Sequence, residues 1–206
     1  MKLGIIGAMD VEVALLKKAM PDAAVTVRAG MDFTSGTLCG TPAVVVQCGV
    51  GKVNAALCVQ ILCDCFGVTH LVNTGVAGSL ANELDIGDVV VSRDAMYHDF
   101  DCSIFGDRYV RGQVPGLPVA FPADAALIAQ AYAANERLAP GHTKIGRVAS
   151  GDQFVGERAQ KAQIVATTHA LCTEMEGAAI AHAAYRNGIP FVILRTISDK
   201  ADDSAA

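Results

Sequence analysis

The sequence has no tryptophan, only 5% aromatic residues and no run of lysine or arginine. A net charge of -5 excludes the basic stripe that neutralises a nucleic-acid backbone, so no nucleic-acid partner is expected. No segment reaches the roughly 20 apolar residues that span a bilayer. The acidic residues Asp10 and Glu12 follow the short N-terminal apolar run, where a signal peptide would need its cleavage region. We therefore expect a soluble protein with no membrane partner.

The sequence also has no pattern of cysteines or histidines that indicates disulfides or a metal site. The 7 cysteines are odd in number and include no Cys-x-x-Cys pair, so neither a disulfide scaffold nor a zinc site is indicated. The 5 histidines lack His-x-x-x-His spacing, and His98 is interpreted as a structural residue rather than half of a metal or nucleophile pair. We expect no metal or other cofactor, and a reducing cytoplasm is the simplest compartment.

Two common nucleotide-binding motifs are absent from the sequence. The segment Gly4-Ile5-Ile6-Gly7 lacks Gly-x-Gly-x-x-Gly spacing. Gly51-Lys52 is followed by Val53, and Val46 stands where a P-loop needs its first glycine. Dinucleotide and triphosphate binding are therefore not supported.

What the sequence does contain is a hydrophobic share of 52% with 20 glycines, spread over 206 residues, which predicts one α/β domain from 1 to 206. Apolar runs and helical spacing alternate along it. Strands are expected at 2–8, 24–28, 33–38, 43–46, 70–74, 88–92, 143–150, 170–173 and 191–197. Helices are expected at 11–20, 54–65, 124–138, from about 157, and at 177–186. A polar excursion at 100–122 is expected to be a long functional or interfacial loop.

Several expected turns follow strands directly, at Gly7–Met9, Gly75–Gly78, Gly151–Phe154, Glu176 and Ser198–Asp199. In open α/β sheets ligands bind beyond the carboxyl ends of the strands, so these turns predict one cleft.

Three carboxylates fall at such positions: Glu12, Glu176 and Asp199. Cleavage of an N-glycosidic bond passes through a ribosyl cation and needs a base for water, an anion beside the sugar and an acid for the base that leaves. Each carboxylate also has a structural interpretation. Glu12 and Glu176 would be favoured by a helix dipole alone, and Asp199 could cap a helix together with Ser198. The residues by themselves leave both interpretations open.

Six motifs cover nearly the whole sequence in order. They are GIIGAMDVEV at 4–13, CGVGKVNAA at 48–56, NTGVAGSL at 73–80, SGDQFV at 150–155, TEMEGAAIAH at 173–182 and RTISDKAD at 195–202. Together they resemble the 5′-methylthioadenosine/S-adenosylhomocysteine nucleosidase family. The resemblance implies a three-layer α/β fold with a mixed, partly barrel-like central sheet flanked by helices, as in nucleoside phosphorylases and hydrolases. It also implies hydrolysis of a 5′-thioether adenine nucleoside, with 5′-deoxyadenosine and aminodeoxyfutalosine as related substrates.

The resemblance implies a role for each carboxylate. Glu12 would activate the attacking water, Glu176 would bind the ribose hydroxyls and support the cation, and Asp199 would donate toward adenine N7. Glu174 would support the site without contacting the sugar in that way.

The resemblance also implies the walls of the site. Phe154 and Val155 would hold the purine, Met9 and Met175 the ribose, and Arg195 would lie on the water side. The remaining substrate-binding residues would be Val50, Val76, Ala77, Gly78 and Ser198. The loop with Phe105 and Pro115 would cover the 5′ substituent of a neighbouring subunit, which implies a homodimer.

Two features depart from that family. Val76 stands where the family usually carries serine, and the further helix that follows the Ile-Ser-Asp motif is not among the 206 residues. The alternatives left open are a phosphate-dependent phosphorylase and a nucleoside-binding or storage protein without catalysis.

Overall fold

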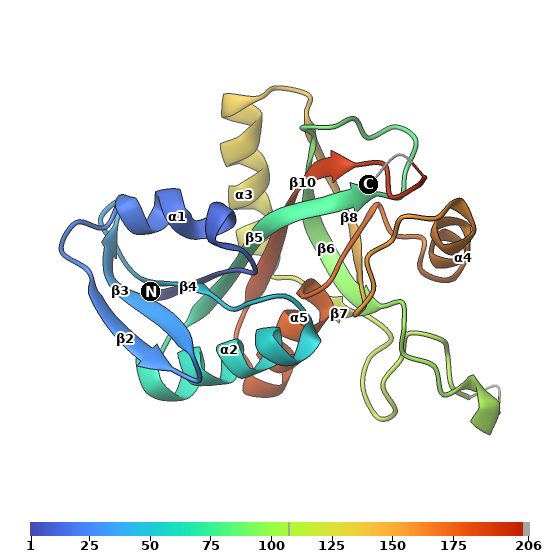
Figure 1. The fold of residues 1–206 in the computed structure, drawn as a ribbon, viewed down its shortest axis with the longest axis horizontal. Helices are drawn as coiled ribbons and strands as arrows, with labels where there is room; N and C mark the ends of the chain where they lie inside the picture. The colour runs from blue at the N-terminus through green and yellow to red at the C-terminus, as the bar shows by residue number, and fades with distance from the viewer. Residues whose placement is uncertain (107, 204–206) are drawn as a thin grey trace.

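A computed structural model describes residues 1–106 and 108–203. These described residues form ten strands, five α-helices and one short 3-10 helix (Figure 1). The strands are β1 (Leu3–Gly7), β2 (Ala24–Arg28), β3 (Met31–Leu38), β4 (Thr41–Gln47), β5 (His70–Ser79), β6 (Val89–Tyr97), β7 (Phe121–Pro122), β8 (Thr143–Ser150), β9 (Cys172–Glu174) and β10 (Phe191–Asp199). The helices are α1 (Asp10–Lys18), α2 (Lys52–Phe66), α3 (Ala125–Leu138), α4 (Arg158–Thr168) and α5 (Gly177–Asn187), with η1 (Ser103–Phe105) as the 3-10 helix.

The strands form one mixed sheet that closes on itself at one end. Its order is β10-β6-β8-β9-β5-β1-β4-β3-β2, and β10 also pairs with β5. That extra pairing joins β5, β9, β8, β6 and β10 into a ring, from which β1, β4, β3 and β2 extend as an open sheet. The mixed, partly barrel-like sheet expected from the sequence is confirmed.

Helices cover both faces of the sheet, with α1 and α2 packed on the open part and α3 and α5 packed on the ring. In Figure 1, α1 and α3 lie on one side of the strands, and α2 and α5 lie on the other. The apolar runs of β1 and β4 are buried because both faces are covered, as in Ile6 and Val46. Leu62 of α2 and Ile180 of α5 pack into the same core. Among the described residues, no helix has the length and apolarity to cross a membrane.

The turn predicted at Gly75–Gly78 is wrong, because β5 continues through it to Ser79. The segment has strand partners that no local pattern reveals: Gly75 pairs with Arg195, and Gly78 pairs with both Asp199 and Thr173. The glycines of this segment allow neighbouring side chains to lie close to the backbone of β5, and they do not form a turn. A Cβ atom at Gly75 would collide with the side chains of Glu12 and Arg195.

The long loop predicted at 100–122 is confirmed over its described part, where η1 and the two-residue β7 are the regular elements. Figure 1 shows the segment with η1 projecting from the body of the molecule. Two of its apolar side chains face solvent, with Ile104 88% and Phe105 70% exposed. An ion pair of 2.7 Å between Arg111 and Asp101 ties the loop to itself.

Candidate active site

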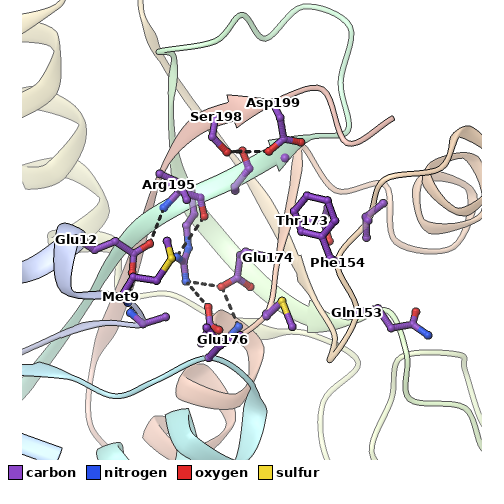
Figure 2. Close-up of a pocket in the computed structure, with 17 residues that line it drawn as sticks. Met9, Glu12, Gln153, Phe154, Thr173, Glu174, Glu176, Arg195, Ser198 and Asp199 are labelled. Atoms are coloured by element: carbon purple, nitrogen blue, oxygen red, sulfur yellow. Dashed lines mark hydrogen bonds and ion pairs between the residues drawn. The ribbon is translucent and has the colours of Figure 1, made fainter. Parts of the chain in front are cut away.

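A cavity of about 270 Å³ opens where β5, β9 and β10 meet the starts of α1 and α5. Its lining comes from six separate segments: Ala8, Met9, Glu12, Val50, Val76, Ala77, Gly78, Gln153, Phe154, Val155, Thr173, Glu174, Met175, Glu176, Arg195, Ser198 and Asp199. Figure 2 shows the carboxylates of Glu12, Glu176 and Asp199 in this one cavity, although they come from α1, the start of α5 and the end of β10.

Backbone groups hold Glu12 at one side of the cavity. Glu12 lies in the first turn of α1, and its Oε2 accepts hydrogen bonds from the N–H groups of Ala8 at 2.7 Å and Met9 at 2.9 Å. Its Oε1 accepts a third, at 3.0 Å, from the N–H of Val76 on β5. Both carboxylate oxygens are therefore oriented by the chain itself, and the Val76 side chain is not needed for that contact.

Glu174 and Arg195 form a buried ion pair in the cavity wall. Arg195 is 1% exposed, and its Nη2 donates to Glu174 Oε2 and, at 2.5 Å, to Asn73 Oδ1. Glu174 also accepts from the Ser150 hydroxyl and from the N–H of Gly177 at 2.8 Å, at the start of α5. The positive end of the helix dipole adds to this stabilisation. Glu174 is thus engaged on every side and supports its neighbours.

Glu176 is buried with much less compensation. It is 4% exposed, its Oε1 accepts one hydrogen bond of 2.8 Å from the Gly51 N–H, and its Oε2 lies 3.7 Å from Arg195 Nη2. Burial, and then the negative charge of Glu174, raise the pKa of Glu176 from 4.5 to about 7. The partial contacts with Arg195 and Gly51 oppose this increase. Glu176 therefore lacks the partners that would fully satisfy a buried anion.

Asp199 ends β10 at the opposite side of the cavity. Its Oδ1 accepts a hydrogen bond of 2.8 Å from the Ala201 N–H, and its Oδ2 accepts one of 2.8 Å from the Ser198 hydroxyl. The contact with the N–H two residues further on gives Asp199 a local role in a tight turn after the strand.

Apolar side chains make up most of the remaining wall. Val155 and Ala77 are buried, whereas Phe154 is 64% exposed and Val76 is 40% exposed. Met9 and Val50 line the cavity and are half-exposed, and Met175 lines it between Glu174 and Glu176 in the sequence. A flat apolar ligand with a few polar edges suits such a cavity.

Most residues predicted for the site surround this cavity. Phe105 and Pro115 do not line it, and both are exposed in the projecting loop. Ala8, Gln153 and Thr173 also line the cavity. Ala8 and Gln153 lie in turns that the sequence predicted to form the cleft, although they were not among the individual site residues, whereas Thr173 was missed. Thr173 immediately precedes Glu174, but nothing in the local pattern distinguishes it.

A mixed sheet closed into a ring, with carboxylates gathered around an apolar cavity, defines an α/β protein of the nucleoside phosphorylase and hydrolase type. Residues 2–206 match the Phosphorylase superfamily. The 5′-methylthioadenosine/S-adenosylhomocysteine nucleosidase of Geobacillus kaustophilus is 42% identical over 206 residues, covering 100% of this chain and 87% of that protein.

Two solved structures are similar across the whole fold. The methylthioadenosine/S-adenosylhomocysteine nucleosidase from Colwellia psychrerythraea, in complex with adenine, has a TM-score of 0.95 at 43% identity and covers 100% of this chain and 85% of that chain. Native futalosine hydrolase of Helicobacter pylori has a TM-score of 0.93 at 34% identity, covering 99% and 87%. The chain belongs to the 5′-methylthioadenosine/S-adenosylhomocysteine nucleosidase family of the Phosphorylase superfamily.

Proposed function

We propose that this protein hydrolyses the N-glycosidic bond of 5′-methylthioadenosine and S-adenosylhomocysteine, releasing adenine and the 5′-thioribose. The observation that carries the proposal is the gathering of Glu12, Glu176 and Asp199 around one apolar cavity. Similarity to nucleosidases at about 40% identity over the full chain supports the same reaction.

Glu12 is the proposed general base. Three backbone N–H groups already orient its carboxylate, and its position on the cavity wall lets it accept a proton from a water molecule that attacks the sugar. A positioned base of this kind contributes about 10²–10⁴-fold to the rate.

Glu176 is the proposed partner of the ribose. Sugar hydroxyls that donate to its carboxylate would supply the hydrogen bonds that its buried site lacks, and its negative charge would stabilise the ribosyl cation in the transition state. Arg195 is held by Glu174 and acts as a supporting group behind it.

Asp199 is the proposed acid for the leaving base. Adenine is a poor leaving group as an anion, so N7 must gain a proton while the glycosidic bond stretches. Asp199 lies at the edge of the cavity with Ser198 on its Oδ2. The backbone and ring of Phe154, with Val155, would hold the plane of the base nearby.

The same contacts would serve related substrates. The 5′ substituent would extend from the ribose past Met9 and Met175, so 5′-deoxyadenosine and aminodeoxyfutalosine are included in the proposal. A futalosine hydrolase among the similar structures supports that breadth.

Phosphorolysis is the less favoured alternative. Among the described residues that line the cavity, Arg195 is the one arginine, and its Nη2 is engaged by Glu174 and Asn73. A phosphate dianion would enter a cavity lined by four carboxylates without a free cation, and like charges in a partly buried site repel strongly. A neutral water molecule experiences no such repulsion.

We also propose that the chain forms a single domain from 1 to 206, works in the cytoplasm and assembles as a homodimer. In the dimer, the exposed Phe105 and the nearby Pro115 would cover the neighbouring cavity mouth. Exposed apolar side chains on a projecting loop favour such an interface over solvent.

Incubation of the purified protein with methylthioadenosine tests the reaction. The proposal predicts saturable release of free adenine in buffer without phosphate. A protein that binds the nucleoside and releases no adenine would be the binding or storage protein instead.

A further inference from the structure

Three charged residues outside the cavity lining meet beside the turn that holds Glu176. Lys52 Nζ lies 2.6 Å from Asp99 Oδ2 and 3.7 Å from Asp152 Oδ2. The N–H of Asp152 also donates to Asp99 Oδ2 at 2.9 Å. We call Lys52, Asp99 and Asp152 the clasp. These residues do not line the described cavity, and the reaction proposed above gives them no task.

The clasp joins segments that are far apart in the sequence. Lys52 is the first residue of α2, Asp99 follows β6 and Asp152 follows β8. Tyr97 pairs with Ser150 at the ends of β6 and β8, so both aspartates leave neighbouring parallel strands at the same edge of the sheet. Lys52 therefore ties the turn before α2 to the ends of two strands.

Two adjacent N–H groups at the start of α2 are divided between the cavity and the clasp. The N–H of Gly51 donates at 2.8 Å to Glu176 Oε1. The N–H of the next residue, Lys52, donates at 2.8 Å to Asp152 Oδ1. Gly51 has a φ of 99°, a conformation that is open to glycine and that local chain stiffness does not enforce. The orientation of the Gly51 N–H therefore depends on the anchor that Asp152 provides for the adjacent peptide group.

Partial exposure indicates that the clasp acts through geometry. The side chains of Lys52, Asp99 and Asp152 are 23%, 16% and 50% exposed. Ion pairs that water reaches contribute little to the free energy of unfolding. The arrangement of hydrogen bonds is therefore a larger contribution of the clasp than the attraction between its charges.

We propose that Asp152 is a positioning residue, which through the clasp keeps the Gly51 N–H on Glu176 and so keeps that carboxylate charged for the ribose. The inference rests on the proposed function, in which the charge of Glu176 stabilises the ribosyl cation. The hydrogen bond from Gly51 favours the charged carboxylate and opposes the rise of the Glu176 pKa to about 7. Loss of this hydrogen bond raises the pKa of Glu176 further.

The other titratable groups that face Glu176 come from four separate segments and stay in place in the test. They are Glu174 of β9, Arg195 of β10, Glu12 of α1 and the thiol of Cys48, which follows β4. Removal of the negative charge of Asp152 would by itself lower the pKa of Glu176. An increase therefore reports the loss of the Gly51 contact and not the loss of a charge.

The test compares Asp152→Ala, which removes the oxygen that accepts from the Lys52 N–H, with Asp152→Asn, which removes the same charge and keeps an oxygen there. The pH dependence of kcat/KM for methylthioadenosine reports the pKa values of the free enzyme. Asp152→Ala is expected to lose about tenfold in kcat/KM at pH 6 and little at pH 9, because the midpoint of its acid limb moves up by about one pH unit. Asp152→Asn is expected to keep the pH dependence of the parent.

Arg147→Met is the matched structural control. The ion pair of Arg147 with Asp94 has the same 2.6 Å distance as the closer pair of Lys52 and a similar exposure, and it lies outside the cavity lining. This variant should lower Tm and leave the pH dependence of kcat/KM unchanged. An equal loss of kcat/KM at every pH in Asp152→Ala, or the same displaced acid limb in Arg147→Met, would overturn the inference.

Thermal unfolding distinguishes a failure of the clasp from a failure of the proposed function. The Tm of Asp152→Ala should fall further below that of the parent at pH 9 than at pH 6, because the folded variant holds the Glu176 proton more tightly. In the Glu176→Gln background this difference should be the same at both pH values. A difference that is independent of pH in both backgrounds would overturn the inference. A parent that binds methylthioadenosine and releases no adenine would refute the proposed hydrolysis, and the Tm comparison would still decide the role of the Gly51 contact.

Discussion

The backbone N–H of Val76 donates a hydrogen bond of 3.0 Å to Oε1 of Glu12, which joins the middle of β5 to the first turn of α1. Oε2 of the same carboxylate is held by the N–H groups of Ala8 and Met9. The carboxylate of Glu12 is therefore oriented by backbone N–H groups of two separate segments. In Glu12→Gln the amide oxygen can still accept from Ala8 and Met9, whereas the amide nitrogen replaces the oxygen that accepts from Val76.

Glu12→Gln is expected to lower kcat by about 10²–10⁴-fold, because the amide keeps the shape and an acceptor oxygen but cannot take a proton from water. Adenine affinity should stay near that of the parent. The matched control is Asp10→Asn, which changes the exposed acid in the same helical turn, outside the cavity, and should leave kcat unchanged. Near-normal turnover in Glu12→Gln would remove Glu12 from the mechanism.

Because the pKa of Glu176 is raised in the folded protein, we expect the contribution of this residue to the free energy of unfolding to fall as pH rises. Its pKa is raised by burial and by Glu174, from 4.5 to about 7 in the folded protein. Between those two values the unfolded chain has already lost the proton that the folded protein retains, so the contribution of Glu176 to stability decreases across that window. Thermal unfolding from pH 4 to pH 8 should therefore show a steeper loss of Tm in the parent than in Glu176→Gln.

The same Glu176→Gln variant should be more stable than the parent at pH 8 and yet nearly inactive. A glutamine can still accept the Gly51 hydrogen bond, but it carries no negative charge for the ribosyl cation. Identical pH profiles of Tm in the two proteins would contradict the buried, poorly compensated state assigned to this carboxylate.

The variant Asp199→Asn distinguishes a catalytic acid role of Asp199 from a purely structural role. Asparagine keeps an oxygen for the Ala201 N–H, so Tm should change little. It cannot deliver a proton to N7, so kcat should fall by roughly 10²–10⁴-fold while adenine affinity changes much less. An unchanged kcat would refute the acid assignment.

The loop with Phe105 predicts a dimer whose cavities depend on both subunits. Sedimentation of the parent should give a dimer at micromolar concentration. Phe105→Ser should raise the KM for methylthioadenosine more than it lowers kcat, because the loop is proposed to cover the 5′ end of the substrate in the neighbouring subunit. Leu15→Ser is the control, as Leu15 is 79% exposed on α1, outside the cavity lining. A fully active monomer would contradict the assembly.

Sequence patterns predicted those elements whose boundaries depend on local chemistry. The strand at 143–150 has the bounds of β8, and the helix at 124–138 begins where Asp124 accepts hydrogen bonds from the N–H groups of Ala126 and Leu127. Gly75–Gly78 was misread because glycines after an apolar run usually mark a turn. Its actual partners, on β9 and β10, lie about a hundred or more residues away in the sequence.

In the candidate site too, local patterns predicted some features, and others depended on contacts between distant segments. Helix starts and strand ends were enough to select Glu12, Glu176 and Asp199 as candidates, whereas their roles came from the family resemblance. The pairing of Arg195 with Glu174, which leaves Glu176 poorly compensated, depends on three-dimensional proximity. Thr173 was missed because its place on the cavity wall depends on the pairing of β9 with β5 and β8.

The fate of the acceptor oxygen tests the central claim most directly. Methylthioadenosine should be incubated with the purified protein in ¹⁸O-labelled water with phosphate present, and the products analysed by mass spectrometry. Hydrolysis by a Glu12-activated water predicts free adenine and a 5′-methylthioribose that carries one ¹⁸O atom introduced during the reaction, once exchange at C1 is measured separately. Methylthioribose 1-phosphate among the products would contradict the account.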